Sequence, residues 1–235
     1  MHLGKVIFPS WLWLLLASLT GVAQTVRPVL EIRAISQPPV LDGKLDDPCW
    51  NDAPALTNFT QVLPVEGDPP TERTEVRFAY NRDTLFVAVR CFDSASDKII
   101  VKQMQHDNAL DSDDRVKIAF DTFARQRDGY YFAVNPAGAR TEGLIQNFSD
   151  ENVLWDTIWE TRARIDAQGW TAEIAIPFNS LSFDPLHDAW GCNLERIIRR
   201  KQETVRWTAR SRAKPMTNLA DFGELRGLHD LKQGR

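Results

Sequence analysis

The stretch DNALDSDD, residues 107 to 114, crowds oxygen-bearing side chains into eight positions. Carboxylate, amide and hydroxyl oxygens are the ligands that calcium prefers, although the glycine turn and closing glutamate of an EF-hand are absent. Aspartates at the ends of neighbouring predicted strands could complete a site. The alternative is a solvated acidic loop whose repulsion is relieved by water, Arg115 and Lys102. Asp107 and Asn108 begin this acidic stretch. The predicted calcium ligands are Asp93, Asp97, Asp111, Asp113, Asp114 and Asp121.

A second group of polar residues follows in NPAGARTEGLIQNF, and the tryptophan-rich segment LWDTIW comes directly after it. Amides, carboxylates and arginine can bind sugar hydroxyls, while an aromatic face can stack on a pyranose ring. Trp155 is the better stacking candidate, with a packing role as the alternative. Trp159 shares a predicted core face with Ala163 and Ile165. The predicted carbohydrate-binding residues are Asn135, Arg140, Glu142, Gln146, Asn147 and Trp155.

The sequence contains no recognisable catalytic motif. None of the four histidines stands in a motif with a serine or cysteine nucleophile, and metalloprotease and nucleotide signatures are missing. Paired carboxylates for glycoside cleavage remain open, because such pairs need only converge in space. No catalytic residue is therefore predicted from the sequence.

Strands must position these residues, because side chains alternate between apolar and polar along most of the chain. The pattern is clear over residues 74–81, 84–93, 115–121, 129–135, 158–166 and 169–178. Residues 81–83 and 166–169 offer the turn chemistry of two hairpins. Runs near 190–200 and 204–210 bring the total to about ten strands, a number typical of a sandwich. The sequence predicts an all-β fold, a two-sheet antiparallel β-sandwich of jelly-roll or immunoglobulin-like type.

The first twenty-three residues read as a secretory signal peptide, since Lys5 precedes an apolar run that ends at small residues. We expect cleavage after Ala23 and a single domain over residues 24–235. The net charge of -4, with signs mixed along the chain, argues against nucleic acid as a partner. Cys91 and Cys192 are predicted to act as small apolar side chains in strands.

Trp50 stands out because it is surrounded by turn residues in VLDGKLDDPCWNDAPAL. Asp42, Gly43, Asp46 and Asp47 supply the turn and Pro48 stiffens it. We expect Trp50 to be structural and to close an open end of the sandwich core.

Five segments in order resemble the family 9 carbohydrate-binding module from about Ile32 to Leu228. They are DGKLDDPCW, TEVRFAYNRDTLFVAVRCFDS, DSDDRVKIAFDTF, GYYFAVNPAG and GWTAEIAIPFNSLSF. The resemblance is to the variant found at the N-terminus of larger secreted bacterial proteins, where an outer-membrane β-barrel region follows. It implies a β-sandwich that binds glycan ends, often with structural calcium. It also implies a module that is not itself catalytic and that accompanies a glycoside hydrolase. Two clamp tryptophans of the sugar-binding members have no counterpart here, and Lys117 replaces an acidic residue.

Two functions follow from these observations. The first is a secreted carbohydrate-binding module that binds polysaccharide or oligosaccharide in a system of degradation or uptake. The second is a structural or interaction domain of an outer-membrane barrel protein that has lost sugar binding. Both functions imply that the chain is secreted across the inner membrane of a bacterium. It would then lie in the periplasm or at the outer membrane. The first function requires a tryptophan such as Trp155 to be exposed in a groove beside Arg140 and Glu142.

Overall fold

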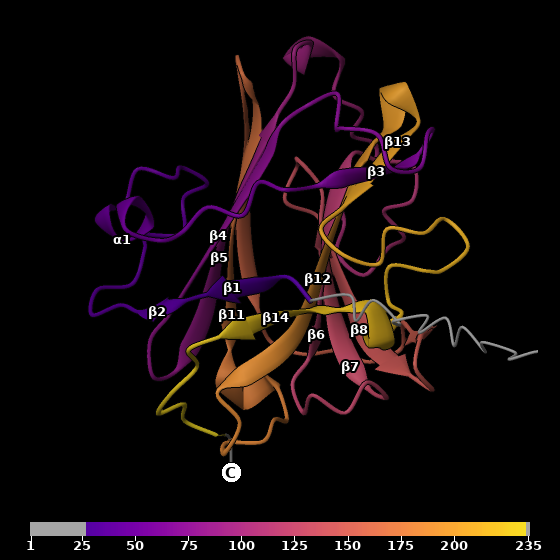
Figure 1. The fold of residues 1–235 in the computed structure, drawn as a ribbon. Coiled ribbons are helices and arrows are strands. Elements are labelled where there is room, and N and C mark those ends of the chain that lie inside the picture. Colours follow the sequence, from indigo (N-terminus) through magenta and orange to yellow (C-terminus); the bar gives the residue numbers. More distant parts are fainter. Residues whose placement is uncertain (1–26, 234–235) are drawn as a thin grey trace, which may run out of the picture.

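The computed structural model describes residues 27–233, and the predicted signal peptide lies outside that range. Two sheets pack face to face as a β-sandwich, as the alternation predicts (Figure 1). One sheet has nine strands and the other has five. No helix in the described part of the chain is long and apolar enough to cross a membrane.

The nine-stranded sheet runs β1-β14-β12-β6-β7-β8-β9, and β13 joins β12 to β3 beside this path. Its strands are β1 (Val29–Glu31), β3 (Thr60–Leu63), β6 (Arg115–Asp121), β7 (Gly129–Val134), β8 (Arg140–Gln146), β9 (Asp150–Asn152), β12 (Ala189–Ile198), β13 (Glu203–Arg206) and β14 (Gly223–Arg226). The five-stranded sheet runs β10-β11-β5-β4-β2. Its strands are β2 (Arg33–Ala34), β4 (Thr74–Tyr80), β5 (Thr84–Phe92), β10 (Glu160–Asp166) and β11 (Gly169–Pro177).

Helical structure is confined to short turns. They are the α-helix α1 (Pro48–Asn51) and the 3₁₀ turns η1 (Ser96–Lys98), η2 (Phe178–Ser180), η3 (Arg199–Lys201) and η4 (Leu219–Asp221). The two predicted hairpins are present, since β4 pairs antiparallel with β5 and β10 with β11. The N-terminal strands differ from the antiparallel prediction, because β1 pairs parallel with β14 and β2 parallel with β4.

One main core fills the space between the sheets, built from the inward side chains of each strand. Trp159, Trp170, Trp190 and Trp207 are all buried in it. Cys91 and Cys192 belong to the same core as free thiols, and burial raises the pKa of Cys91 to about 11. Their predicted role as small apolar side chains agrees with this position.

Trp50 is buried, as predicted, but the expected position at an open end of the core is wrong. It lies in α1, on the outer face of the five-stranded sheet (Figure 1). There it packs against small side chains of separate strands, Ala79, Ala88 and Ala175, and against Phe86. These alanines leave a shallow depression that a large ring can fill, so Trp50 covers the sheet from outside.

Candidate functional site

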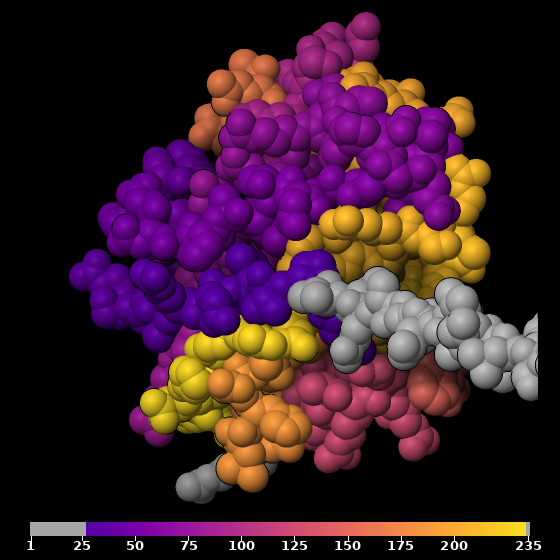
Figure 2. Space-filling model, in the orientation of Figure 1, coloured from indigo at the N-terminus to yellow at the C-terminus, as the bar shows by residue number. Residues whose placement is uncertain are grey.

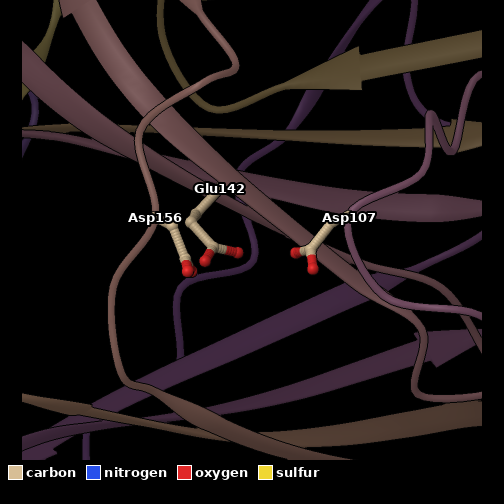
Figure 3. Close-up of side chains that lie close together, drawn as sticks. All are labelled: Asp107, Glu142 and Asp156. Atoms are coloured by element: carbon tan, nitrogen blue, oxygen red, sulfur yellow. The ribbon is translucent and has the colours of Figure 1, made fainter.

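Three carboxylates meet at one side of the sandwich although they are far apart in the sequence. Asp107 comes from the loop before β6, Glu142 from β8, and Asp156 from the segment between β9 and β10. Oxygens of all three lie within 4.8 Å of one another, and Figure 3 shows Glu142 and Asp107 pointing toward each other with Asp156 beside Glu142. Within residues 27–233 they are the sole group of three or more His, Cys, Asp or Glu side chains this close. We call this group the carboxylate cluster.

The strand register places Glu142 on the inner side of its sheet. Glu142 is opposite Phe132 of β7, whose ring belongs to the main core. The segment from residue 153 to residue 159 packs over this part of the sheet, because Trp159 contacts Phe132 with ring centroids 5.1 Å apart. The Thr157 N–H from the same segment donates a long hydrogen bond of 3.4 Å to Oε1 of Glu142. Glu142 is therefore held beneath a covering segment, at a relative exposure of 5%.

Asp107 is attached to the same strand by its backbone. Its N–H donates to the carbonyl of Arg140, the first residue of β8, over 3.0 Å. The left-handed backbone at Asp107, with a φ of 62°, turns the loop back at this point. Aspartate tolerates that conformation better than most residues. The attachment explains how an exposed loop residue comes to face a buried glutamate.

The cluster carries negative charge with little compensation. None of its three carboxylates forms an ion pair with a Lys, Arg or His side chain within the described residues. Oε2 of Glu142 is buried and has no hydrogen-bond partner there. Burial raises the pKa of Glu142, and Asp156 and Asp107 act in the same direction against the lowering effect of Trp159 and Thr157. The Arg140 guanidinium lies over the Trp159 ring, 5.4 Å from its centroid.

Trp155 borders the cluster from the covering segment. It is half-buried, and its ring packs against Tyr130 and Phe132 with centroid distances of 5.0 and 6.4 Å. Every other tryptophan between residues 27 and 233 is at most 3% exposed. Trp155 is thus the tryptophan of the described chain whose ring remains available to a ligand.

The remaining predicted carbohydrate-binding residues are either buried or at the far end of β8. Asn135 is fully buried, and its side chain contacts the carbonyl of Gln103 and Oδ2 of Asp113 while its Oδ1 accepts from Ala137 and Ala139. Gln146 and Asn147 are exposed at the opposite end of β8 from Arg140. Arg140 and Glu142 thus share a face of β8, and Trp155 packs on Phe132, the register partner of Glu142. Asn135 is buried in the hairpin beside Arg140, whereas Gln146 and Asn147 lie at the far end of the strand.

The predicted calcium ligands are distributed over several places rather than gathered into one site. Asp113 accepts the N–H groups of Lys102 and Gln103 at 3.0 Å and so shapes the loop. Asp93 pairs with Arg200, Asp111 pairs with Arg115, and Asp121 accepts backbone N–H groups of its own turn. Asp114 accepts from the Arg199 N–H, and Asp97 is exposed in η1.

The residues predicted from the sequence do not include two members of the carboxylate cluster. Asp107 belongs to the acidic run but was left out of the predicted set, and Asp156 stands between two tryptophans in LWDTIW. A carboxylate between two aromatic residues was the available signal for Asp156. Its convergence with Glu142 depends on the path of the covering segment, which no local pattern specifies.

A separate hollow lies on the outer face of the five-stranded sheet. It has a volume of about 460 Å³ and its lining includes Arg77, Arg90 and Arg164. Two of these arginines are already engaged, because Arg90 pairs with Asp166 at 2.5 Å and Arg77 with Glu75 at 3.2 Å. The polar groups there therefore largely bind one another.

A comparison with family models matches residues 41–226 to the family described as "Carbohydrate family 9 binding domain-like". No curated protein matches the chain. Among solved structures, a family 9 carbohydrate binding module from Caldicellulosiruptor kristjanssonii in complex with cellotriose is similar, with 17% identity, a TM-score of 0.63, and coverage of 88% of this chain and 95% of that one. A structure described in the same words, but in complex with glucose, gives 18% identity, a TM-score of 0.60 and coverage of 87% and 96%.

A candidate carbohydrate-binding protein from Bacteroides uniformis ATCC 8492 gives a TM-score of 0.66 at 13% identity. The alignment covers 85% of this chain and 99% of that one. At these identities the likeness establishes the sandwich fold.

Proposed function

The chain belongs to the carbohydrate family 9 binding domain-like family, and on that premise we propose that it is a carbohydrate-binding module that holds a saccharide without cleaving it. The observation that carries this proposal is the position of Trp155. Its half-buried ring lies in the covering segment next to the exposed carboxylate Asp156 and packs on Phe132, which lies opposite Glu142 in the sheet register. An aromatic face bordered by such groups is how proteins bind the apolar face and the hydroxyls of a sugar.

The comparisons support a saccharide as the ligand. The two structures from Caldicellulosiruptor kristjanssonii contain cellotriose and glucose respectively. We propose a glucose-containing oligosaccharide or polysaccharide as the first ligand to test for this chain. The predicted signal peptide supports action outside the inner membrane, in polysaccharide degradation or uptake.

The test is titration calorimetry of the chain without its predicted signal peptide against glucose, cellotriose and a panel of other glycans. We expect saturable binding, and we expect Trp155→Ala to weaken it at least about tenfold, or ~1.4 kcal/mol. Loss of a stacking surface is the physical reason. Phe92→Ala is the matched control, because Phe92 is a half-buried aromatic residue of the other sheet. Unchanged affinity in Trp155→Ala would exclude this surface, and release of reducing ends would contradict a non-catalytic role.

The second candidate function is the interaction domain of an outer-membrane barrel protein. It is favoured by apolar side chains that reach solvent in the turn between β8 and β9 and in the covering segment. They are Phe148, Val153, Leu154 and Ile158, with exposures of 60, 65, 91 and 78%. Absence of binding to every glycan of the panel, together with a folded protein, would favour this second function over the first.

A further inference from the structure

We propose that a hollow beside β14 is a second binding site, one that takes an anionic saccharide, meaning a sugar that carries carboxylate or sulfate groups. The anionic character of the ligand follows from the residues of the hollow, whereas its being a saccharide rests on the proposed function. The hollow is separate from the surface around Trp155, because neither Trp155 nor any other residue of the covering segment lines it.

The hollow lies at a break in the nine-stranded sheet. β6 occupies one edge of β12, so β13 and β14 share the other edge, where β13 pairs with Glu195–Ile198 and β14 with Ala189–Cys192. The chain leaves the sheet after β13 and returns to it at β14 (Figure 1). Residues from 27–29, 207–211 and 220–226 line the hollow beside this break. Its volume of about 1040 Å³ exceeds that of the hollow on the five-stranded sheet and is large enough for a saccharide.

The first argument is unpaired positive charge. Three arginines and two carboxylates line the hollow. Both carboxylates are engaged, because Glu224 pairs with Arg226 at 2.5 Å and Asp221 pairs at 2.7 Å with a lysine that does not line the hollow. The other two arginines, Arg27 and Arg210, form no ion pair within residues 27–233. The lining therefore carries two positive charges that no carboxylate of the described chain neutralises.

The two unpaired guanidiniums contact only uncharged groups. Nη2 of Arg27 donates to the Ala220 carbonyl at 3.3 Å, and the Gln126 amide can be oriented so that its oxygen accepts from the same Nη2 at 2.8 Å. Arg210 donates to two backbone carbonyls, at 3.0 and 3.3 Å. A guanidinium has five N–H donors and binds carboxylate-like oxyanions through parallel hydrogen bonds. Both arginines thus retain donors for an anionic ligand.

The second argument is a buried hydroxyl in the wall of the same hollow. Thr208 lines the hollow and is 4% exposed, and its Oγ1 has no hydrogen-bond partner within the described residues. The backbone of Thr208 is held in place, because its N–H donates to Oδ1 of Asn193 at 2.9 Å. Buried polar atoms are normally satisfied, so this hydroxyl requires a partner. An oxygen of a ligand in the hollow would supply that partner.

The experiment titrates the chain without its predicted signal peptide with saccharides that differ in charge. Trigalacturonate supplies carboxylates and a κ-carrageenan oligosaccharide supplies sulfates, with methyl-esterified trigalacturonate and the desulfated oligosaccharide as the matched neutral forms. We expect calorimetry to show saturable binding of an acidic saccharide, at least about tenfold tighter than its neutral form. The tighter of the two acidic ligands identifies the anionic group. Added NaCl should weaken the binding, because it screens the exposed guanidiniums.

Variants locate the ligand. Arg27→Gln and Arg210→Gln should each weaken binding of the acidic saccharide at least about tenfold. Arg82→Gln is the matched control, because Arg82 is an exposed arginine of the turn between β4 and β5 and its replacement removes the same charge. It should leave the affinity unchanged. Thr208→Val should weaken binding about fivefold or more without lowering Tm, since the hydroxyl that it removes has no partner in the described chain.

Equal affinity for the acidic and neutral forms would overturn the proposal, and so would unchanged affinity in Arg27→Gln and Arg210→Gln. Inorganic sulfate is a further probe, and sulfate that binds as tightly as the acidic saccharide would contradict a saccharide as the ligand. Failure of the proposed function has a different signature, namely no response to glucose or cellotriose while the acidic saccharide still binds. Conversely, Arg210→Gln should leave the binding of cellotriose unchanged.

Discussion

Glu173 shows how one outward-facing carboxylate fixes a long surface segment. It lies in β11 on the face away from the main core, yet it is fully buried. Its Oε2 accepts the N–H groups of Asp42 and Gly43 at 3.0 Å, and its Oε1 accepts the Trp50 indole N–H at 3.1 Å. Burial raises the pKa of Glu173, and these three donors oppose that rise. The segment carrying Trp50 is thus held by both ring packing and hydrogen bonds.

The contribution of this anchor can be measured by truncating Trp50. We expect Trp50→Ala to lower the free energy of unfolding by about 3 kcal/mol, because a buried indole and its hydrogen bond are both lost. Trp50→Phe keeps an aromatic ring and should cost less. Urea denaturation at neutral pH is the measurement, with Leu186→Ala as the control because Leu186 is 90% exposed. A change below about 0.5 kcal/mol in Trp50→Ala would contradict the structural role.

The sequence predicts the role of an individual residue better than the position of that residue in the fold. Trp50 was correctly expected to be structural, because an apolar ring among turn residues must be buried somewhere. Its position depends on alanines of three strands, β4, β5 and β11, that adjoin only after the sheet forms. The carboxylate cluster has the same origin: Glu142 was named from the sequence, whereas Asp107 and Asp156 join it through tertiary contacts.

At the scale of elements, alternation predicted the strands and the faces of their side chains. It did not predict what covers each face. Glu142 and Gln146 share a face of β8, but the covering segment buries Glu142 and leaves Gln146 exposed. Ile165 likewise lies at the end of the edge strand β10 and is 46% exposed, although its face is the one predicted to be apolar. Coverage depends on how far the opposing sheet extends, which periodicity does not encode.

The ends of several elements are joined by a buried ionic network around Glu72. Glu72 precedes β4 and accepts hydrogen bonds from Lys201 at 2.6 Å and Arg200 at 3.0 Å, both in η3. It also accepts from the N–H and hydroxyl of Ser94, just after β5, at 3.1 and 2.6 Å. Burial opposes its ionisation, but the hydrogen bonds from Lys201 and Ser94 prevail and lower the pKa of Glu72 to about 2.

This network predicts a pH dependence. The pKa of Glu72 lies below its ordinary value of 4.5, so the folded state favours the ionised form. The resulting stabilisation is complete above pH 4.5 and is lost as the pH falls toward 2. Glu72→Gln should therefore be less stable at pH 7 and should lose less stability than the unmodified chain over that acid range.

Urea denaturation at a series of pH values measures the difference. Glu160→Gln serves as the control, because Glu160 is an exposed residue of the edge strand β10 and should leave the pH profile unchanged. Equal slopes for Glu72→Gln and the unmodified chain between pH 4.5 and pH 2 would show that the network does not act in this way.

At the scale of the whole molecule, the two ends of the chain join the two sheets. The segment from Val29 to Ala34 supplies β1 to one sheet and β2 to the other, and Figure 2 shows it beside the C-terminal strands. From the opposite end, the carbonyl of Gly227 accepts the Tyr80 hydroxyl at 2.5 Å, and the His229 N–H donates to the same hydroxyl at 3.2 Å. The sequence predicted the two layers but not these parallel terminal pairs, because their partners lie far apart in the chain and adopt no common local pattern.

Ile32 lies between β1 and β2, so it tests whether the two sheets unfold together. Its side chain is 4% exposed in the main core, and its N–H donates to the Arg226 carbonyl at 2.9 Å. Ile32→Ala should lower the free energy of unfolding by about 2–4 kcal/mol, because it leaves a cavity where both sheets meet. Far-ultraviolet circular dichroism and tryptophan fluorescence should still report one coincident transition, since a single core links the sheets.

Val29→Ala is the matched control from the same segment, as Val29 is 42% exposed and its truncation should cost far less. Two separate transitions in Ile32→Ala would show instead that each sheet has independent stability, and that the terminal segments only connect them.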